Sequence, residues 1–167
     1  MAKRTLTIEA EYDYDFHLFA ICGRINHYKL CYFINKKLQS SLGRSKVDIL
    51  VKKEKEAGEI AFPLYSFDDK PNDSVWLLHA NKHETDVEED SQELEGSLFV
   101  GLKNTRRQKY TLIEEHNKVD YFLQVHHPLS DTEKKEIIQN IKLIKHVLAI
   151  YELDISTIKS KENLLIH

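Results

Sequence analysis

Two carboxylates and a histidine in the C-terminal half of the chain are the side chains best suited to acid–base chemistry. Glu115, Asp120 and His126 lie close together in the sequence, and a carboxylate and an imidazole are the usual groups for proton transfer near neutral pH. A small enzyme that uses Asp120, Glu115 and a histidine as acid and base is therefore one hypothesis. Tyr121 directly follows Asp120. We take these four residues as candidate binding residues and assign none of them a catalytic role.

Two pairs of histidines are candidate metal ligands. His79 and His83 are four positions apart, which would place both on one face of a helix, but residues 75–79 have the pattern of a strand and the HExxH order is absent. His126 and His127 are adjacent, so in a strand they would point to opposite faces of the sheet. The sequence therefore predicts no metal site, and it predicts no cofactor.

Motifs for nucleophilic catalysis and for phosphate binding are missing from the sequence. Cys31 falls on the apolar stripe of a predicted helix, where a thiol is buried and unreactive, and Cys22 and Cys31 lack the CxxC spacing of a redox pair. The five glycines form no P-loop, GxSxG or GxGxxG pattern. These observations favour a function other than catalysis.

Composition excludes several further classes of protein. Hydrophobic residues make up 41% of the chain and charged residues 31%, which fits a globular domain and excludes wholesale disorder. The formal net charge of −3 provides no general attraction for nucleic acid, and the basic residues within 103–109, beside Tyr110, form too small a patch to indicate it. No apolar run approaches the roughly 20 residues of a membrane helix, and the N-terminus lacks a signal-peptide pattern. We expect a cytoplasmic protein with no membrane or nucleic-acid partner.

The elements that would position the candidate residues begin with strand and helix patterns in the first half of the chain. Residues 5–11 alternate as a strand does. The apolar run 16–22 fits a buried strand or a short helix, and Asp15 as a helix cap favours the helix. The spacing over 26–41 predicts an amphipathic helix. Three strands are expected within 47–82, one of them placed at an edge or a bulge by Pro63.

The second half of the chain begins with an acidic stretch. Residues 84–95 contain seven carboxylates and no basic residue, which predicts a mobile solvated loop. Alternation over 119–125 predicts a strand with one strongly apolar face, and 131–148 has the pattern of a helix capped by Ser130 or Asp131. Residues 147–153 fit either the next strand or an extension of that helix. A strand, a helix and a strand would form a crossover between parallel strands, adjacent or with one strand between them.

A nine-residue segment in this region resembles a family signature. Residues 113–121 read IEEHNKVDY and resemble the motif of the IPExxxVDY family, a bacterial family without an assigned activity. Five positions of the motif match, and Glu114 stands where the family has proline. The motif predicts one turn of helix over 114–118 that leads into a strand, because proline and glutamate both suit the first turn of a helix. We therefore favour a structural role for it. The resemblance supplies no substrate, partner or cofactor.

Together these patterns predict one α+β domain over residues 1–167. A mostly antiparallel sheet would pack against two main helices, 26–41 and 131–148, with a ferredoxin-like or ACT-like arrangement in the C-terminal part, and edge pairing of such sheets suggests a homodimer. The favoured function is a non-enzymatic module that binds an unidentified protein or small molecule. A pocket lined by Glu115, Asp120 and a histidine would favour the enzyme instead, whereas burial of Asp120 in backbone hydrogen bonds would favour the module.

Overall fold

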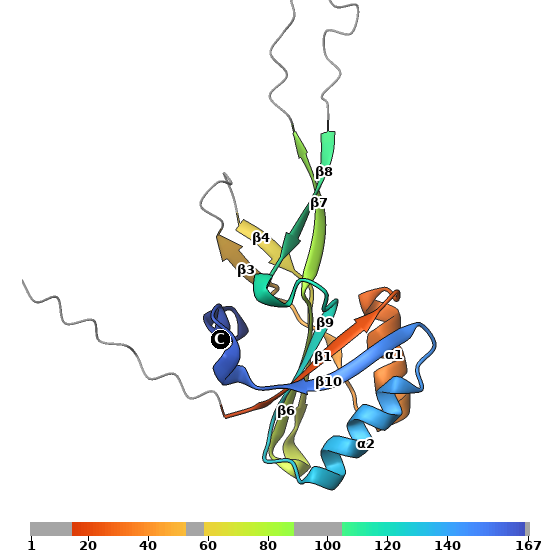
Figure 1. Ribbon diagram of the computed structural model, residues 1–167. Helices are drawn as coiled ribbons and strands as arrows, with labels where there is room; N and C mark the ends of the chain where they lie inside the picture. The colour runs from red at the N-terminus through yellow and green to blue at the C-terminus, as the bar shows by residue number, and fades with distance from the viewer. Residues whose placement is uncertain (1–14, 53–58, 89–104, 166–167) are drawn as a thin grey trace, which may run out of the picture.

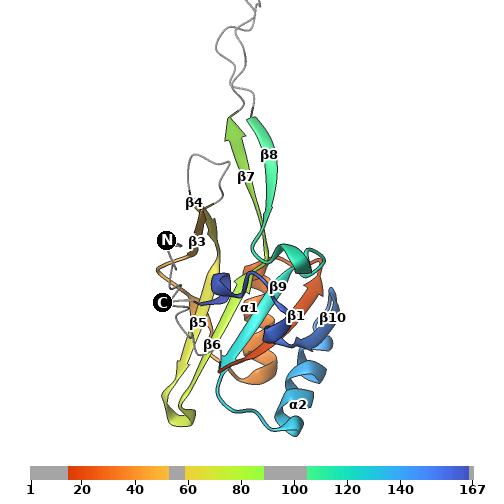
Figure 2. The same cartoon turned by 60° about the vertical axis from the view of Figure 1, so that its left-hand side comes forward.

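Six antiparallel strands form the central sheet of the protein. The computed structural model describes residues 15–52, 59–88 and 105–165. The strands are β1 (His17–Gly23), β2 (Gly43–Arg44), β5 (Leu64–Asp69), β6 (Ser74–Ala80), β9 (Tyr121–His126) and β10 (Val147–Leu153). Their order across the sheet is β10-β1-β9-β6-β5-β2, and every neighbouring pair is antiparallel. Two further antiparallel ribbons are formed by β3 (Ile49–Lys52) with β4 (Glu59–Phe62) and by β7 (Lys82–Glu88) with β8 (Thr105–Thr111). Figures 1 and 2 show the β7–β8 ribbon extending away from the sheet.

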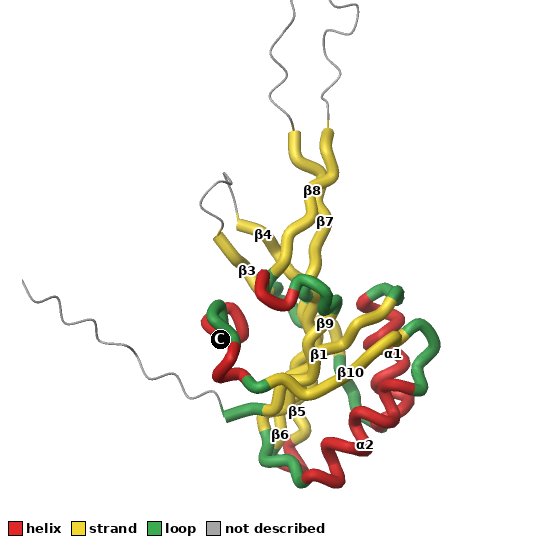
Figure 3. Tube along the Cα trace, viewed as in Figure 1, coloured by secondary structure: helices red, strands yellow, loops and turns green. Residues whose placement is uncertain are grey.

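Both helices cover the same face of the sheet. α1 (His27–Leu38) and α2 (Asp131–Lys142) lie on one side of it (Figure 3). The apolar side chains of both helices pack with those of β1, β6, β9 and β10 in one hydrophobic cluster. This arrangement confirms the predicted α+β fold, with a mostly antiparallel sheet packed against two main helices.

The opposite face of the sheet is buried as well. The β3–β4 ribbon, residues 110–119 and two short C-terminal turns, η3 (Ile155–Thr157) and η4 (Lys161–Leu164), contribute to a second hydrophobic cluster there. Phe122 and Gln124 of β9 are therefore as fully buried as Leu123 and Val125. The predicted strand over 119–125 forms from Tyr121 onward, and its predicted apolar face packs in the first cluster through Tyr121, Leu123 and Val125. The other face is buried too, because β9 is a central strand covered on both sides.

The two predicted helices are shorter than their patterns indicated. α1 ends at Leu38 because Gln39 adopts a left-handed conformation with φ of 54°. α2 begins with a capping box, in which Ser130 and Glu133 bond to each other's backbone N–H, and ends at Lys142. Residues 147–153 form strand β10, so the helix predicted over 131–148 was too long. Leu148, at the end of the predicted helix, lies in β10 and is 69% exposed. β9 and β10 are parallel with β1 between them, as one form of the predicted crossover required.

The apolar run 16–22 belongs to a strand, so the favoured helix was wrong and its alternative is confirmed. β1 lies between β9 and β10, and both of its faces are covered. Leu18 and Ala20 pack in the second cluster, whereas Phe19 and Ile21 pack in the first. A strand buried on both faces has a continuous apolar sequence without alternation, which is why the periodicity did not identify it. The predicted strand 5–11 lies outside the described residues.

Part of the predicted acidic loop is a strand. Residues 84–88 belong to β7, so the prediction is corrected there, and 89–95 lie outside the described residues. Within the basic segment 103–109, residues from Thr105 onward form β8. Charges of opposite sign pair across the ribbon, with Lys109 Nζ at 2.9 Å from Glu84 Oε1 and Arg107 Nε at 3.7 Å from Asp86 Oδ1. Cross-strand pairing of this kind offsets the repulsion that the acidic sequence suggested.

The order of helices and strands along the chain can be compared with the predicted ferredoxin-like or ACT-like arrangement. Apart from the strands β2 to β5 and the β7–β8 ribbon, the elements run β1-α1-β6-β9-α2-β10, which is a β-α-β-β-α-β order. The ferredoxin-like or ACT-like arrangement stays a prediction, as does the homodimer. In the described part of the chain, none of the helices has the length and apolar character needed to cross a membrane.

Candidate functional site

Asn81 is the centre of the hydrogen bonds around the IPExxxVDY-like motif. This residue lies between β6 and β7 and its side chain is fully buried. Its amide nitrogen donates to the carbonyls of His116 and Val119 at 2.9 and 3.0 Å, and its side-chain oxygen accepts from the N–H of Ile113 at 2.8 Å. Its backbone N–H donates to the carbonyl of Asp120 at 2.9 Å. One asparagine therefore fixes the segment that carries the motif, including the turn η2 (Glu114–His116) that was predicted over 114–118.

Asp120 and Tyr121 hold the turn that connects β1 to α1. Asp120 Oδ2 accepts a hydrogen bond from the N–H of Gly23 at 2.8 Å, and Oδ1 accepts one from the lysine that begins β7 at 2.7 Å. The buried Tyr121 hydroxyl donates to the carbonyl of Ile25 at 2.5 Å. Burial, together with the nearby charge of Asp120, raises the pKa of Tyr121 to about 12, so the hydroxyl stays protonated. The two motif residues fix the backbone on both sides of Arg24.

Glu115 binds the C-terminal segment. Its Oε1 accepts hydrogen bonds from the N–H groups of Lys159 and Ser160 at 2.7 and 2.9 Å, and its Oε2 accepts one from the Ser160 hydroxyl at 2.9 Å. Partial burial alone would raise the pKa of Glu115. The hydrogen bonds from Ser160, from its own N–H and from Lys159 together outweigh this effect and lower the pKa to about 2. The carboxylate is therefore ionised at neutral pH and connects η2 to the residues between η3 and η4.

His126 belongs to a row of polar side chains under the second hydrophobic cluster. The Gln124 side-chain oxygen can only accept, so His126 Nε2 donates to it at 3.1 Å, and the Gln124 amide nitrogen donates to His79 Nε2 at 3.0 Å. His79 is fully buried, and its Nδ1 has no hydrogen-bond partner within the described residues. Burial lowers the pKa of His79 to about 4 and also lowers that of His126. The row is therefore uncharged at neutral pH.

The four candidate residues do not meet in one pocket. Asp120 directly precedes β9 and His126 is its last residue, so six residue steps of about 3.3 Å each separate them by roughly 20 Å. Glu115 and Asp120 each accept backbone N–H groups elsewhere in the fold. Within the described residues no group of three or more potential ligands could hold a metal ion. Asp120 accepts one backbone hydrogen bond, from Gly23, but its side chain is 28% exposed and its second oxygen pairs with Lys82, so the burial in backbone hydrogen bonds that would favour a binding module is present only in part.

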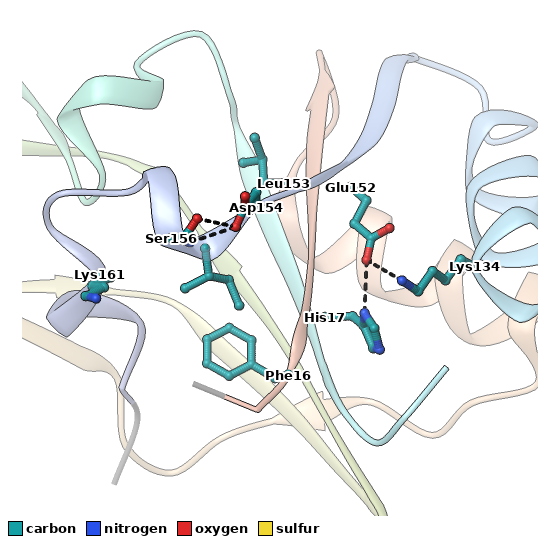
Figure 4. A pocket seen from close by; sticks show the side chains of 9 residues that line it. Phe16, His17, Lys134, Glu152, Leu153, Asp154, Ser156 and Lys161 are labelled. Carbon is teal, nitrogen blue, oxygen red and sulfur yellow. Dashed lines mark hydrogen bonds and ion pairs between the residues drawn. The ribbon is translucent and has the colours of Figure 1, made fainter. Parts of the chain in front are cut away.

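A cavity of about 680 Å³ lies where β1 begins and β10 ends (Figure 4). There the Glu152 carboxylate accepts from Lys134 Nζ and from His17 Nδ1, both at 2.9 Å. His17 Nε2 accepts from the N–H of Leu129 at 3.1 Å, so both ring nitrogens of the histidine are engaged. Lys134 and His17 are both bound to Glu152, and we interpret this cluster as a connection between β1, β10 and α2.

A second cavity, of about 650 Å³, lies between the β1–α1 turn, the start of α1 and the α2–β10 loop. We call it the basic groove and define it by six of its lining residues, Arg24, Tyr28, Lys29, Tyr32, Lys145 and His146. None of its lining residues is a carboxylate. Within the described residues, Arg24, Lys29 and Lys145 take part in no ion pair. Tyr28 and Tyr32 are 53% and 61% exposed. The groove therefore combines unpaired positive charge with uncovered aromatic rings.

Close backbone contact holds the two sides of the groove together. The N–H of Arg24 donates to the carbonyl of His146 at 3.0 Å. A Cβ atom on Gly23 would lie 2.6 Å from the same carbonyl oxygen, so only glycine permits this approach. His146 itself has a left-handed φ of 75°, which turns the chain from α2 into β10. Arg24 and Lys145 are thus brought to one cavity from distant parts of the sequence.

Our sequence reasoning missed the basic groove, although the sequence carries a signal for it. Residues 16–47 contain six lysines and arginines and no aspartate or glutamate. This local excess of positive charge occurs in a chain whose formal net charge is −3. The acidic stretches elsewhere in the chain mask it in the overall composition.

Comparisons with family models, with curated proteins and with solved structures found no match to this chain. The resemblance to the IPExxxVDY family therefore stays a prediction.

Proposed function

We propose that this protein is a non-enzymatic binding module and that the basic groove binds a small anionic ligand. The observation that carries the proposal is the set of cations, Arg24, Lys29 and Lys145, that line one cavity without a carboxylate partner among the described residues. Like charges that face one cavity repel each other, and a bound anion relieves that repulsion. The volume of about 650 Å³ lies in the range of small-molecule sites.

The start of α1 supports an anionic ligand. Asn26, at the N-cap position, makes no hydrogen bond to the helix backbone through its side chain, and the first turn of α1 contains no acidic residue. The positive end of the helix dipole is therefore not offset by the helix's own side chains. This end adds to the attraction of the three cations for an anion.

The motif residues have a positioning role in this proposal. Asp120 binds the backbone of Gly23, and Tyr121 binds that of Ile25. Both contacts are adjacent in sequence to Arg24. The proposed role therefore connects the IPExxxVDY-like segment to the groove without placing its carboxylates in contact with the ligand. We also keep membership of that family and a ferredoxin-like arrangement as proposals, the latter supported by the β-α-β-β-α-β order of elements.

Binding of inorganic pyrophosphate, measured by isothermal titration calorimetry, tests the proposal. We expect wild-type protein to bind it with an affinity that decreases as salt concentration rises, because exposed charges are screened. Arg24→Gln and Lys145→Gln should each weaken binding by about threefold to tenfold, which corresponds to about 0.7–1.4 kcal/mol for an exposed cation.

A matched control separates the groove from general electrostatic attraction. Lys70 is an exposed lysine in the turn between β5 and β6, so Lys70→Gln removes the same charge outside the groove and should leave the affinity unchanged. The proposal fails if pyrophosphate does not bind, or if Lys70→Gln weakens binding as much as Arg24→Gln and Lys145→Gln do.

A further inference from the structure

We propose that the ligand of the basic groove is a nucleotide, with its phosphates on the cations and its base on the exposed tyrosines. This inference rests on the proposed function, since it names the chemical class of the anion. It is carried by a second set of side chains, the aromatic ones, which an inorganic anion would leave unused. The groove offers both kinds of contact at once.

The tyrosines form an aromatic surface along α1. Tyr28 and Tyr32 are four positions apart, so they project from the same side of the helix. They are 53% and 61% exposed, which is unusual for two adjacent large aromatic side chains. A planar base stacked on either ring would cover apolar area that is now in contact with water.

Neighbouring side chains restrict the movement of both rings. The Tyr28 hydroxyl accepts a hydrogen bond from the side-chain amide of Asn26 at 3.2 Å. The Tyr32 ring meets the Phe33 ring nearly edge to face, with centroids 5.3 Å apart and an angle of 70° between the planes. Rings that are already held in place lose less conformational entropy when a base stacks on them.

The cations lie on both sides of this aromatic surface. Lys29 Nζ is 6.0 Å from the centroid of the Tyr28 ring. Arg24 precedes the helix, and Lys145 comes from the α2–β10 loop that borders the groove. A ligand that stacks on α1 therefore meets positive charge at the β1–α1 turn and at the opposite loop. An acidic peptide would satisfy these cations, but its carboxylates would not use the flat faces of the tyrosines, so we favour a nucleotide.

Three probes test this inference by isothermal titration calorimetry: ADP, inorganic pyrophosphate and adenosine. Stacking of one base on an aromatic side chain is worth about 1–3 kcal/mol, so we expect ADP to bind at least fivefold more tightly than pyrophosphate, and adenosine to bind more weakly than ADP. Tyr32→Leu should reduce the affinity for ADP at least fivefold and leave the affinity for pyrophosphate unchanged. Arg24→Gln should weaken the binding of both ADP and pyrophosphate.

Tyr151 provides the matched control, because it is 41% exposed on β10 and lies outside the groove. Tyr151→Leu should leave ADP binding unchanged. Equal affinities for ADP and pyrophosphate, or an equal loss of both affinities in Tyr32→Leu, would overturn the inference that the ligand is a nucleotide and would leave the anion-binding proposal intact. Failure of both anions to bind would overturn the proposed function as well. A five-residue oligoadenylate that binds more than tenfold tighter than ADP would replace the free nucleotide by a nucleic-acid strand.

Discussion

Removal of one oxygen atom tests the connection between the motif and the groove. Tyr121→Phe keeps the buried ring and deletes only the hydroxyl that donates to the Ile25 carbonyl at 2.5 Å. Tyr121 and Ile25 are both 9% exposed, so water replaces the lost donor poorly. A buried hydrogen bond of this kind contributes about 1–2 kcal/mol. Replacement by alanine would also remove the ring and should cost about 3–5 kcal/mol.

Urea denaturation measures the first part of this prediction. With a slope of about 2 kcal/mol per molar, the middle of the usual range for small proteins, the expected loss lowers the denaturation midpoint of Tyr121→Phe by about 0.5–1 M. The second part is functional. The Tyr121 hydroxyl fixes the residue that follows Arg24. We therefore expect the folded variant, measured without urea, to bind pyrophosphate about threefold to tenfold more weakly than wild type. Tyr151→Phe is the control for loss of a hydroxyl from a more exposed tyrosine.

Two results would refute this reasoning in different ways. An unchanged midpoint in Tyr121→Phe would show that the hydroxyl contributes nothing to the β1–α1 turn. A lowered midpoint with unchanged pyrophosphate affinity would show that the turn is stabilised by Tyr121 but does not position Arg24. In that second case the motif would be a structural element with no connection to binding.

Three further predictions concern stability. Asn81→Ala removes three side-chain hydrogen bonds from a buried site and should lower the free energy of unfolding by about 3 kcal/mol in urea titrations. The pKa of Glu115 is about 2 in the folded protein, whereas its ordinary value is 4.5. Between these pH values the unfolded chain binds more protons, so stability falls as the pH is lowered through this range. Glu115→Gln should lower the free energy of unfolding at neutral pH by about 1 kcal/mol and remove this contribution to the pH dependence. The pKa of His79 is about 4 in the folded protein, whereas its ordinary value is 6.5. Between these pH values the unfolded chain again binds more protons, so stability falls by up to about 3 kcal/mol from pH 6.5 to 4. His79→Leu should make stability less dependent on pH in this range.

Each of these predictions has a contrary result. A midpoint for Asn81→Ala within experimental error of wild type would contradict the central role of that side chain. For Glu115→Gln, loss of stability with an unaltered slope below pH 4.5 would show that its charge is not what binds Ser160. If His79→Leu keeps the wild-type slope between pH 6.5 and 4, another group, such as His27 or His126, dominates that range.

The helices and several strands were predictable because their local patterns agree with the fold. α2 combines a capping box with a regular apolar stripe, and both features are visible in sequence. For β1 the sequence favoured a helix, and the strand was only the alternative, because a strand buried on both faces shows no alternation of apolar and polar residues. β7 was missed because its charges are paired with those of β8, whose partner residues lie more than twenty positions away in the chain.

The candidate residues were predictable only in part. Asp120 and Tyr121 were named from the motif, but the sequence did not show that they bind Gly23 and Ile25. Asn81 was not among the candidate residues, since nothing local indicates that an asparagine will be fully buried. The basic groove combines residues near 24–33 with residues 145 and 146. Only the folded chain brings these together, so no short motif could reveal the groove.

The position of β1 in the sheet governs the order in which the fold can be completed during synthesis. β1 is the first described strand to leave the ribosome, yet its two neighbours are β9 and β10, so that Ile21 pairs with Tyr121 on one side and Ile150 on the other. Until β9 has been translated, this apolar strand lacks both of its sheet neighbours, and a nascent chain in this condition is prone to aggregate. A stop between β9 and β10 would leave β1 as an open edge of the sheet. A truncation that removes β10 should therefore reduce the yield in the cell by more than the number of lost residues suggests.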